Sequence, residues 1–285
     1  MFHSTQWVQM DKNKNLLSSA EMTAYWRSRE PDLSGDWLSG RLSSQAGRKL
    51  ADEFRDRVYP LVERHLAIRN RFFRSRVTRL LDRGVFDACI SLGSGLSLLT
   101  SYLAAESAHA VRFYDVDEPA MCEVRQQRLQ RVEREFDHSV WRRIECLSFD
   151  LEEAVQAGRR LSGIVPGVHA PIVLIEGLLY FLSKRCIQRI FEWGKEFAVA
   201  AFVFDYWPDD APRKSPVFRN TVSFLASCIT EEVQVLMGAT ELRELIHPWQ
   251  LQEDVEISEV EPEFTSPALM NSVEGIVPAH LAVVV

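Results

Sequence analysis

Two glycines separated by one residue, Gly93 and Gly95, lie where an apolar run changes to a helical pattern in FDACISLGSGLSLLTSYLA. Glycine accepts positive φ angles and has no side chain to block a ligand, and the N-terminus of the following helix offers unpaired N–H groups. A turn of this kind lets the backbone approach a nucleoside. It also fits a plain strand-to-helix turn, so the pattern needs support from other residues.

Acidic side chains follow three later apolar runs. An acid after the second strand of an open α/β sheet can bind ribose hydroxyls, and one after the third can accept the adenine amino group. A carboxylate inside an apolar run is unusual, because burying it without partners is costly. The three acids are Asp117 after Val111–Tyr114, Asp150 after Ile144–Phe149, and Glu176 after Ile172–Ile175.

Two of these acids also have a purely structural explanation. Asp117 precedes Pro119 and could cap the helix that this proline begins. Glu176 could cap a helix or form a buried pair with an arginine. Helix capping and cofactor binding do not exclude one another, so both explanations stay open for these acids.

A glycine turn followed by an acid fits either a nicotinamide dinucleotide or S-adenosylmethionine. In the dinucleotide pattern G-x-G-x-x-G the third glycine would stand at position 98, where this chain has Leu98. A bulky residue there opposes the close packing that a pyrophosphate site requires. The sequence therefore favours S-adenosylmethionine, with an NAD-dependent oxidoreductase as the alternative.

These residues can meet only if the surrounding elements form a parallel sheet. From Ala20 to Gly84 apolar residues recur at helical spacing, which predicts a helical N-terminal segment. After Gly84 short apolar runs alternate with amphipathic stretches, a pattern typical of a parallel α/β sheet covered on both faces. Because the carboxyl ends of parallel strands share one edge, the glycine turn and the acids should be neighbours there. The predicted strands are Phe86–Leu92, Val111–Tyr114, Ile144–Phe149, Ile172–Ile175 and Phe197–Phe204.

The C-terminal third has a different pattern. Prolines crowd the segment after Asp205, and a long amphipathic helix is expected over Val217–Met237, with a shorter one near Glu241–Leu245. Val255–Val260 and Ala279–Val285 alternate in polarity and predict an antiparallel pair at one side of the sheet. No linker or repeat interrupts the chain. We therefore expect a single domain over 1–285, with a helical cap at 1–84 and an α/β core at 85–285 that carries a cap insertion around 206–250.

Composition excludes several other classes of protein. The 285 residues are 46% hydrophobic and carry a formal charge of −7, so no positive field draws the chain to nucleic acid. The apolar runs are shorter than the roughly 20 residues of a membrane span, and the start lacks a basic leader with an apolar stretch. Five cysteines without a C-x-x-C pair, and histidines without metal-binding spacing, predict no metal site. A cytoplasmic location follows as the expectation.

Six ordered fragments together resemble the leucine carboxyl methyltransferase family of class I S-adenosylmethionine-dependent methyltransferases, in particular its bacterial small-molecule and polyketide-associated branch. The resemblance implies a Rossmann-like, mostly parallel seven-stranded sheet with helices on both faces and a helical N-terminal cap. It also implies S-adenosylmethionine as cofactor and S-adenosylhomocysteine as product. The fragments are TAYWRSRE, NRFFRSRV, ISLGSGLS, YDVDEPAMCEVR, SFDLEE and IEGLLYFLS.

The resemblance also implies roles for individual residues. Arg76 in NRFFRSRV would pair with the methionine carboxylate of the cofactor, although it could equally belong to a solvated basic helix face. Gly93 and Gly95 match the glycine turn and Asp117 the ribose acid. Asp150 with Leu151 matches the adenine-side pair, and Glu176 the acid near the methionine amino group.

Four departures from the family pattern concern the rest of the site. Ser97-Leu98-Leu99 replaces a common Asp-Thr-Arg, and Arg125 replaces the family lysine after the ribose acid. Ser39-Gly40 replaces a usual Asp-Pro, and Phe181 replaces a common tyrosine. These changes leave the cofactor half largely matched. They also allow a third hypothesis, a binding subunit with a methyltransferase fold and no activity.

Methyl transfer from a sulfonium is an in-line displacement, so the enzyme chiefly supplies alignment and a water-poor chamber. A carboxylate acceptor is already nucleophilic, whereas a hydroxyl needs a base. We expect O-methylation of a small molecule in bacterial secondary metabolism, with S- or N-methylation left open. The residues predicted to shape the acceptor pocket are Tyr25, Tyr180 and Tyr206.

Overall fold

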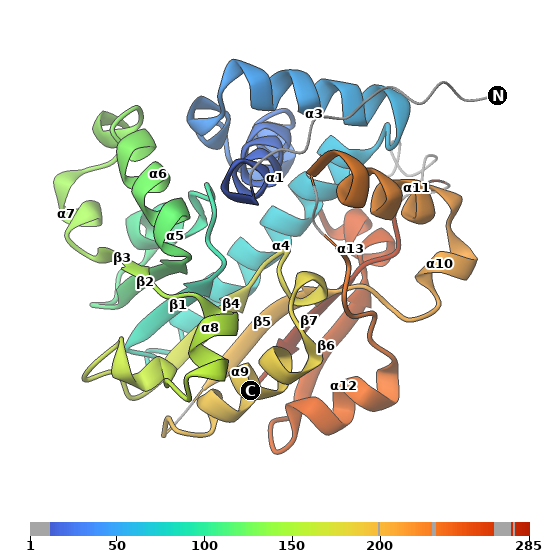
Figure 1. Ribbon diagram of the computed structural model, residues 1–285. Coiled ribbons are helices and arrows are strands. Elements are labelled where there is room, and N and C mark those ends of the chain that lie inside the picture. The colour runs from blue at the N-terminus through green and yellow to red at the C-terminus, as the bar shows by residue number, and fades with distance from the viewer. Residues whose placement is uncertain (1–11, 199, 230–231, 265–274, 276) are drawn as a thin grey trace.

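A seven-stranded sheet forms the centre of the computed structural model, which describes residues 12–198, 200–229, 232–264, 275 and 277–285 (Figure 1). Across the sheet the strands follow the order β3-β2-β1-β4-β5-β7-β6. Their bounds are β1 Ala88–Leu92, β2 Arg112–Asp117, β3 Ile144–Ser148, β4 Pro171–Ile175, β5 Ala201–Tyr206, β6 Leu251–Glu256 and β7 His280–Val284.

The strands β1 to β5 run parallel to one another, and β7 lies antiparallel to both β5 and β6. The parallel strands β1, β4 and β5 are buried on both faces, which explains their continuous apolar sequences. The prediction of a mostly parallel α/β sheet with an antiparallel pair at one side is confirmed.

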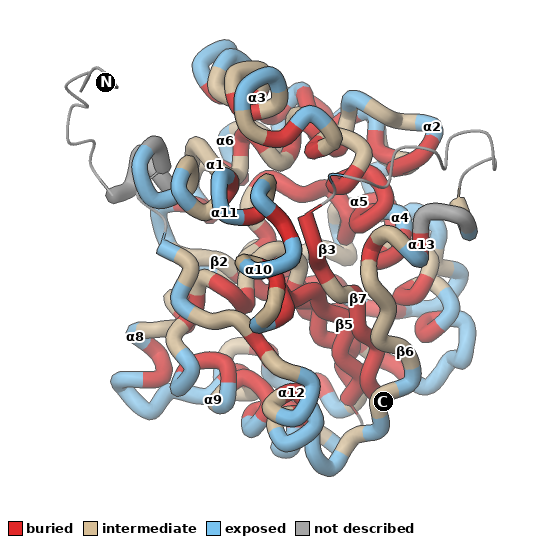
Figure 2. Tube along the Cα trace, turned by 90° about the vertical axis from the view of Figure 1, so that its right-hand side faces the viewer, coloured by how far each residue is buried: buried red, intermediate tan, exposed pale blue. Residues whose placement is uncertain are grey.

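Helices cover both faces of this sheet. One core joins the sheet to α4, α5 and α13, and a second joins its opposite face to α8, α9 and α12. Figure 2 shows the central strands buried and the outer turns of the helices exposed. The helices are α1 Lys12–Arg27, α2 Pro31–Ser34, α3 Gln45–Arg57, α4 Val62–Leu81, α5 Leu99–Glu106, α6 Pro119–Leu129, α7 His138–Trp141, α8 Leu151–Gln156, α9 Lys184–Gly194, α10 Ala211–Lys214, α11 Pro216–Phe224, α12 Ala239–Ile246 and α13 Ile257–Phe264.

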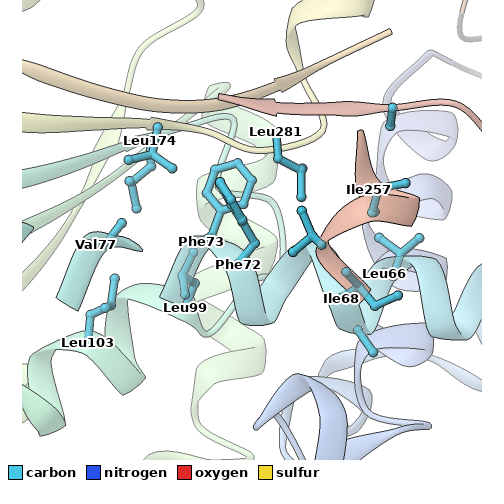
Figure 3. Packing of buried hydrophobic residues seen from close by; sticks show 14 of the residues in the cluster. Leu66, Ile68, Phe72, Phe73, Val77, Leu99, Leu103, Leu174, Ile257 and Leu281 are labelled. Carbon is cyan, nitrogen blue, oxygen red and sulfur yellow. The ribbon is translucent and has the colours of Figure 1, made fainter. Parts of the chain in front are cut away.

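Helix α4 is central to the N-terminal segment. It lies against β5 and β7 on one side and against α1 and α2 on the other, so it is buried on most of its surface. Phe72 and Phe73 pack toward Leu174 of β4 and Leu281 of β7 in Figure 3. Burial of a large apolar side chain stabilises by about 1.5–3 kcal/mol, so this face anchors α4 to the sheet. Arg69 and other polar groups of α4 are buried along with it.

Two sequence expectations in the C-terminal third are wrong in detail. The predicted strand Val255–Val260 spans the end of β6 and the start of α13, because Ile257 and Val260 pack into the core as one helical face. The predicted helix Val217–Met237 ends early: α11 stops at Phe224 and a π-helical turn follows over Leu225–Ile229. Within the described residues, no helix combines the length and apolar character needed to cross a membrane.

Candidate active site

Strand register brings the predicted site residues to one edge of the sheet. Leu92 pairs with Val116 on one side and with Ile175 on the other, and Ile175 pairs with Phe204. In the same way Asp117 pairs with Ser148. The residues after these strand ends are therefore neighbours, as expected for a parallel sheet. Gly93, Asp150 and Glu176 follow strand ends, while Asp117 and Asp205 are among the last two residues of β2 and β5.

The glycine turn follows β1 and both of its glycines have positive φ angles, 64° at Gly93 and 50° at Gly95. Gly93 N donates to Val116 O at 2.9 Å, which joins the turn to the neighbouring strand. A Cβ at Gly93 would lie 2.9 Å from Leu178 Cδ2, closer than side chains tolerate. Both the backbone angle and the close approach of Leu178 therefore require glycine at position 93.

Asp117 connects β2 to this turn. Its Oδ2 accepts a hydrogen bond from Gly95 N at 2.6 Å, and its Oδ1 accepts from Glu118 N at 2.8 Å. It does not cap α6, where the N-cap is Glu118. Burial raises the pKa of Asp117, although the two backbone hydrogen bonds oppose that rise. The carboxylate is thus held beside the backbone that a nucleoside would approach.

Arg125 of α6 holds the glycine turn by hydrogen bonds to its backbone carbonyl groups. The guanidinium group is fully buried and donates to Gly95 O at 3.0 Å and to Ser97 O at 2.7 Å. It also pairs with Asp115, whose carboxylate accepts a hydrogen bond from Thr100. Sequence reasoning noticed Arg125 only as a replacement for a lysine and missed this role. The signal was its position one turn of helix beyond Cys122, on the face of α6 that packs against β2 and β3.

Glu176 forms the centre of a buried charged cluster. Its carboxylate accepts hydrogen bonds from Arg27 of α1 at 2.7 Å and from Arg69 of α4 at 3.1 Å, and its side chain is 6% exposed. Burial alone would raise its pKa, but the two guanidinium charges and their hydrogen bonds outweigh burial and lower it. The alternative of a buried pair with arginine therefore describes Glu176 in this structure.

A second carboxylate, Asp205 of β5, belongs to the same cluster. It accepts from Gly177 N at 2.5 Å and from Arg69 Nη1 at 3.3 Å. Burial raises its pKa, against the opposing effects of Arg69 and Gly177. The two acids shift in opposite directions because Glu176 faces two guanidinium groups and Asp205 only one, at a longer distance.

Tyr180 places an aromatic ring against this cluster. Its hydroxyl accepts from Arg69 Nη1 at 3.4 Å, and burial raises its pKa. The ring stacks on Trp207 with 3.9 Å between centroids and 1° between planes. The ring of Phe181 meets the Tyr180 ring edge-on, with 4.7 Å between their centroids. Among the described residues, Tyr180 is the one of the three predicted pocket tyrosines whose side chain forms a hydrogen bond with the buried charged cluster.

Asp150 and Leu151 lie at the third strand end. The Asp150 carboxylate caps α8 and accepts from Glu153 N at 2.9 Å, while Leu151 is 8% exposed and packs into the second core. The structure therefore gives Asp150 the cap role that polar residues often have before a helix. It leaves the adenine-side role of this pair as a prediction.

The position of Arg76 differs from the expectation. Its guanidinium is bound by Glu253 of β6 and Glu263 of α13, at the opposite side of the sheet from the glycine turn. The arginines that reach Glu176 are Arg27 and Arg69, neither of which the sequence reasoning selected. Arg69 lies two helical turns before Arg76 in the same basic run, so composition alone could not separate them.

Two of the tyrosines also lie elsewhere. Tyr206 faces the core opposite Asp205, because successive strand residues point to opposite faces, and its hydroxyl donates to Asp254 at 3.0 Å. The ring of Tyr25 lies beneath the guanidinium groups of Arg29 and Arg48, at 5.5 and 5.9 Å. These contacts do not join either tyrosine to Glu176 or Arg69, and the roles of Tyr206 and Tyr25 in the acceptor pocket stay predictions.

The residues at this edge fit an adenosyl sulfonium cofactor. Ser94 Oγ in the glycine turn and Arg27 Nε beside Glu176 are buried and have no hydrogen-bond partner among the described residues. Buried polar groups are normally satisfied, so these donors are suited to bind an additional polar molecule. With the carboxylate of Asp117 on one side and two guanidinium groups on the other, the edge offers acceptors for hydroxyls and donors for a carboxylate.

Comparisons with known proteins agree with this fold. The fold is similar to that of a protein of Thermobifida fusca YX provisionally named a methyltransferase, with a TM-score of 0.64, 15% identity and 93% of each chain covered. It is also similar to a DUF574 family protein of Streptomyces avermitilis MA-4680, with a TM-score of 0.61, 12% identity, 93% of this chain and 96% of that chain. A search of curated proteins gave no significant match.

The family model named leucine carboxyl methyltransferase matches residues 10–194, which include the glycine turn and the acids Asp117, Asp150 and Glu176. This range covers well over half of the chain and supports the expectation of an enzyme that uses S-adenosylmethionine. The protein is a member of the leucine carboxyl methyltransferase family, and hence an S-adenosylmethionine-dependent methyltransferase.

Proposed function

We propose that the protein transfers the methyl group of S-adenosylmethionine to an oxygen atom of a small-molecule acceptor, in bacterial secondary metabolism and in the cytoplasm. The observation that carries this proposal is that two sets of polar residues lie at the same edge of the sheet. One is the glycine turn tied to Asp117, and the other is the pair of arginines bound to Glu176. Family membership favours methyl transfer over hydride transfer to a nicotinamide.

In this proposal the cofactor lies across both groups. Asp117 holds the ribose hydroxyls, with Asp150 and Leu151 on the adenine side. Arg69 takes the role first expected of Arg76 and, with Arg27, binds the methionine carboxylate. Planar guanidinium groups suit that carboxylate because they offer paired donors and keep their charge when buried. When bound, the cofactor supplies an electrophilic methyl group.

The protein's own contribution is alignment in a site that excludes water. The buried arginines and acids around Tyr180 are paired with one another. Their dipoles are therefore fixed and need to reorient little during the reaction. A carboxylate acceptor needs no base here. For a hydroxyl acceptor, Asp205 lies in the same cluster and could accept the proton.

A cavity next to the aromatic stack supports a small and partly apolar acceptor. Its volume is about 390 Å³, within the range of small-ligand sites. The ring of Phe218, which lines it, meets the ring of Trp207 edge-on at 5.0 Å, and Trp207 stacks on Tyr180. The lining is Pro212, Phe218, Arg219, Val222, Val233, Gln234 and Leu236.

The test is transfer of a labelled methyl group from S-adenosylmethionine to a panel of small carboxylic acids and phenols. We expect label in the small-molecule fraction, released by mild base if the product is an ester and retained if it is an ether. Label found only on macromolecules would contradict the small-molecule acceptor. Cofactor binding without transfer to any acceptor would instead support a binding subunit.

A matched pair of variants tests the position of the acceptor. Val222→Trp fills the cavity beside Phe218 and should raise KM for the acceptor at least tenfold without changing affinity for S-adenosylhomocysteine. Leu245→Trp fills a cavity of similar size, about 360 Å³, between α9 and α12, and should leave KM unchanged. Equal effects of the two substitutions would contradict this placement.

A further inference from the structure

Two cysteines contact each other close to the ribose side of the site. Cys122 lies in the first turn of α6 and Cys146 lies in β3, next to Leu147, whose carbonyl oxygen the Cys122 thiol approaches. Both are free thiols. Cys122 Sγ also lies 3.4 Å from Leu147 O and 3.5 Å from Asp117 O. The pair therefore sits between the ends of β2 and β3.

The two thiols differ in reactivity. Cys146 is partly exposed, whereas Cys122 is 5% exposed, so an oxidant reaches Cys146 more easily. The neighbouring Cys122 thiol lowers the pKa of Cys146, whereas the Cys146 thiol and burial raise the pKa of Cys122. A thiolate is the nucleophilic form of cysteine, which makes Cys146 the attacking group. Cys89 and Cys186 are fully buried in the two cores and lack this access.

We propose that Cys122 and Cys146 form a reversible disulfide when the protein meets hydrogen peroxide. The Cys146 thiolate attacks one peroxide oxygen and becomes a sulfenic acid, and the released hydroxide takes the proton that Cys146 had lost. The Cys122 thiol then attacks the sulfenic sulfur, and its proton leaves with the hydroxyl group as water. In total the two thiols lose two electrons, and one molecule of hydrogen peroxide is reduced to two waters. A thiol reductant reverses the reaction by exchange.

The bond would act on the glycine turn through Arg125. Cys146 is in register with Asp115, the acid that pairs with Arg125, and Arg125 lies about one turn after Cys122 on α6. Sulfur atoms in a disulfide are about 2.05 Å apart, so its formation draws α6 toward β3. That movement displaces Arg125 relative to Gly95 O and Ser97 O. We therefore expect oxidation to weaken binding at the turn, a consequence that rests on the proposed function.

The test is intact-mass measurement of the full chain before and after hydrogen peroxide, followed by alkylation and peptide mapping. Wild type should lose about 2 Da and yield a peptide that links Cys122 to Cys146, and dithiothreitol should restore the mass. Cys146→Ser should abolish the link. Cys122→Ser should leave Cys146 as a sulfenic acid that dimedone traps. Cys186→Ala, a buried cysteine outside the pair, should react as wild type does.

No linked peptide in wild type, or dimedone trapped on Cys122 in Cys146→Ser at the rate seen on Cys146, would overturn the proposal. Affinity for S-adenosylhomocysteine, measured on reduced and oxidised wild type, tests the second consequence. We expect at least a fivefold loss on oxidation that dithiothreitol reverses, and equal affinities would refute the coupling to the glycine turn. If reduced protein binds no S-adenosylhomocysteine, the proposed function fails, while the mass measurement still decides the disulfide.

Discussion

His65 should make the stability of the protein depend on pH between 7 and 5. The ring lies on α4 with 4% of its surface exposed, and its Nδ1 lies 3.0 Å from the hydroxyl oxygen of Tyr59. Burial, together with the positive charge of Arg69, lowers the pKa of His65 from 6.5 to about 3. The imidazole is therefore neutral in the folded protein throughout this pH range, whereas in the unfolded chain it takes up a proton as the pH falls.

The magnitude follows from the difference between the two pKa values. A group whose pKa is lowered on folding contributes stability above its unfolded pKa, and that stability is lost as the pH falls toward the folded pKa. From the ordinary value of about 6.5 down to pH 5, the loss is about 2 kcal/mol. Because the folded pKa of about 3 lies well below pH 5, this loss depends almost only on the unfolded value.

Urea unfolding of wild type and His65→Gln at pH 7 and pH 5 measures the effect. The free energy of unfolding of wild type should fall by about 2 kcal/mol more than that of His65→Gln. Tyr59→Phe is the matched control: it removes the hydroxyl but keeps the ring buried, so the wild-type pH dependence should persist. Parallel curves for wild type and His65→Gln would refute the reasoning that burial keeps this imidazole neutral.

Three further variants test the charged groups around the sheet. Arg125→Met leaves Asp115 buried and should lower the free energy of unfolding by about 3–5 kcal/mol, partly recovered when Asp115→Asn is added; strict additivity would contradict the pairing. Glu176→Gln should cost about 3 kcal/mol at neutral pH. Because folding lowers the pKa of Glu176, the difference in free energy of unfolding between wild type and Glu176→Gln should shrink below about pH 4. A difference that stays constant with pH would contradict the lowered pKa. Arg76→Met should destabilise by about 1–3 kcal/mol, limited by the partial exposure of its partners, yet leave affinity for S-adenosylhomocysteine within twofold; a tenfold loss would restore its cofactor role.

Much of the fold could be predicted because strands that are buried on both faces have continuous apolar sequences. The predicted run Ile172–Ile175 lies within β4, and Gly93 and Asp117 fall at strand ends as the period change suggested. Predictions failed where one apolar run serves two elements, as at Ile257, which is the first residue of a helix and not part of a strand. Periodicity over a few residues cannot separate these cases. The division into a cap and a core within a single domain stays a prediction.

The site residues at the strand ends could be predicted, whereas their partners from the helices could not. Glu176 was recognisable because a carboxylate in an apolar run needs partners, but the partners Arg27 and Arg69 come from distant helices whose rotation the sequence does not fix. A residue's position along α4 decides whether it lies near Glu176 or near β6. The basic run around Arg69 and Arg76 does not show which of the two reaches Glu176. Tyr206 shows the same limit, because a shift of one residue along a strand reverses the face.

The central claim is that the glycine turn and Asp117 together bind the adenosyl cofactor. Titration calorimetry of wild type and Asp117→Ala with S-adenosylhomocysteine tests it most directly. We predict saturable binding of one ligand per chain, at least tenfold weaker in Asp117→Ala, while the variant remains folded. Absence of binding to wild type, or equal affinity in the variant, would contradict the claim.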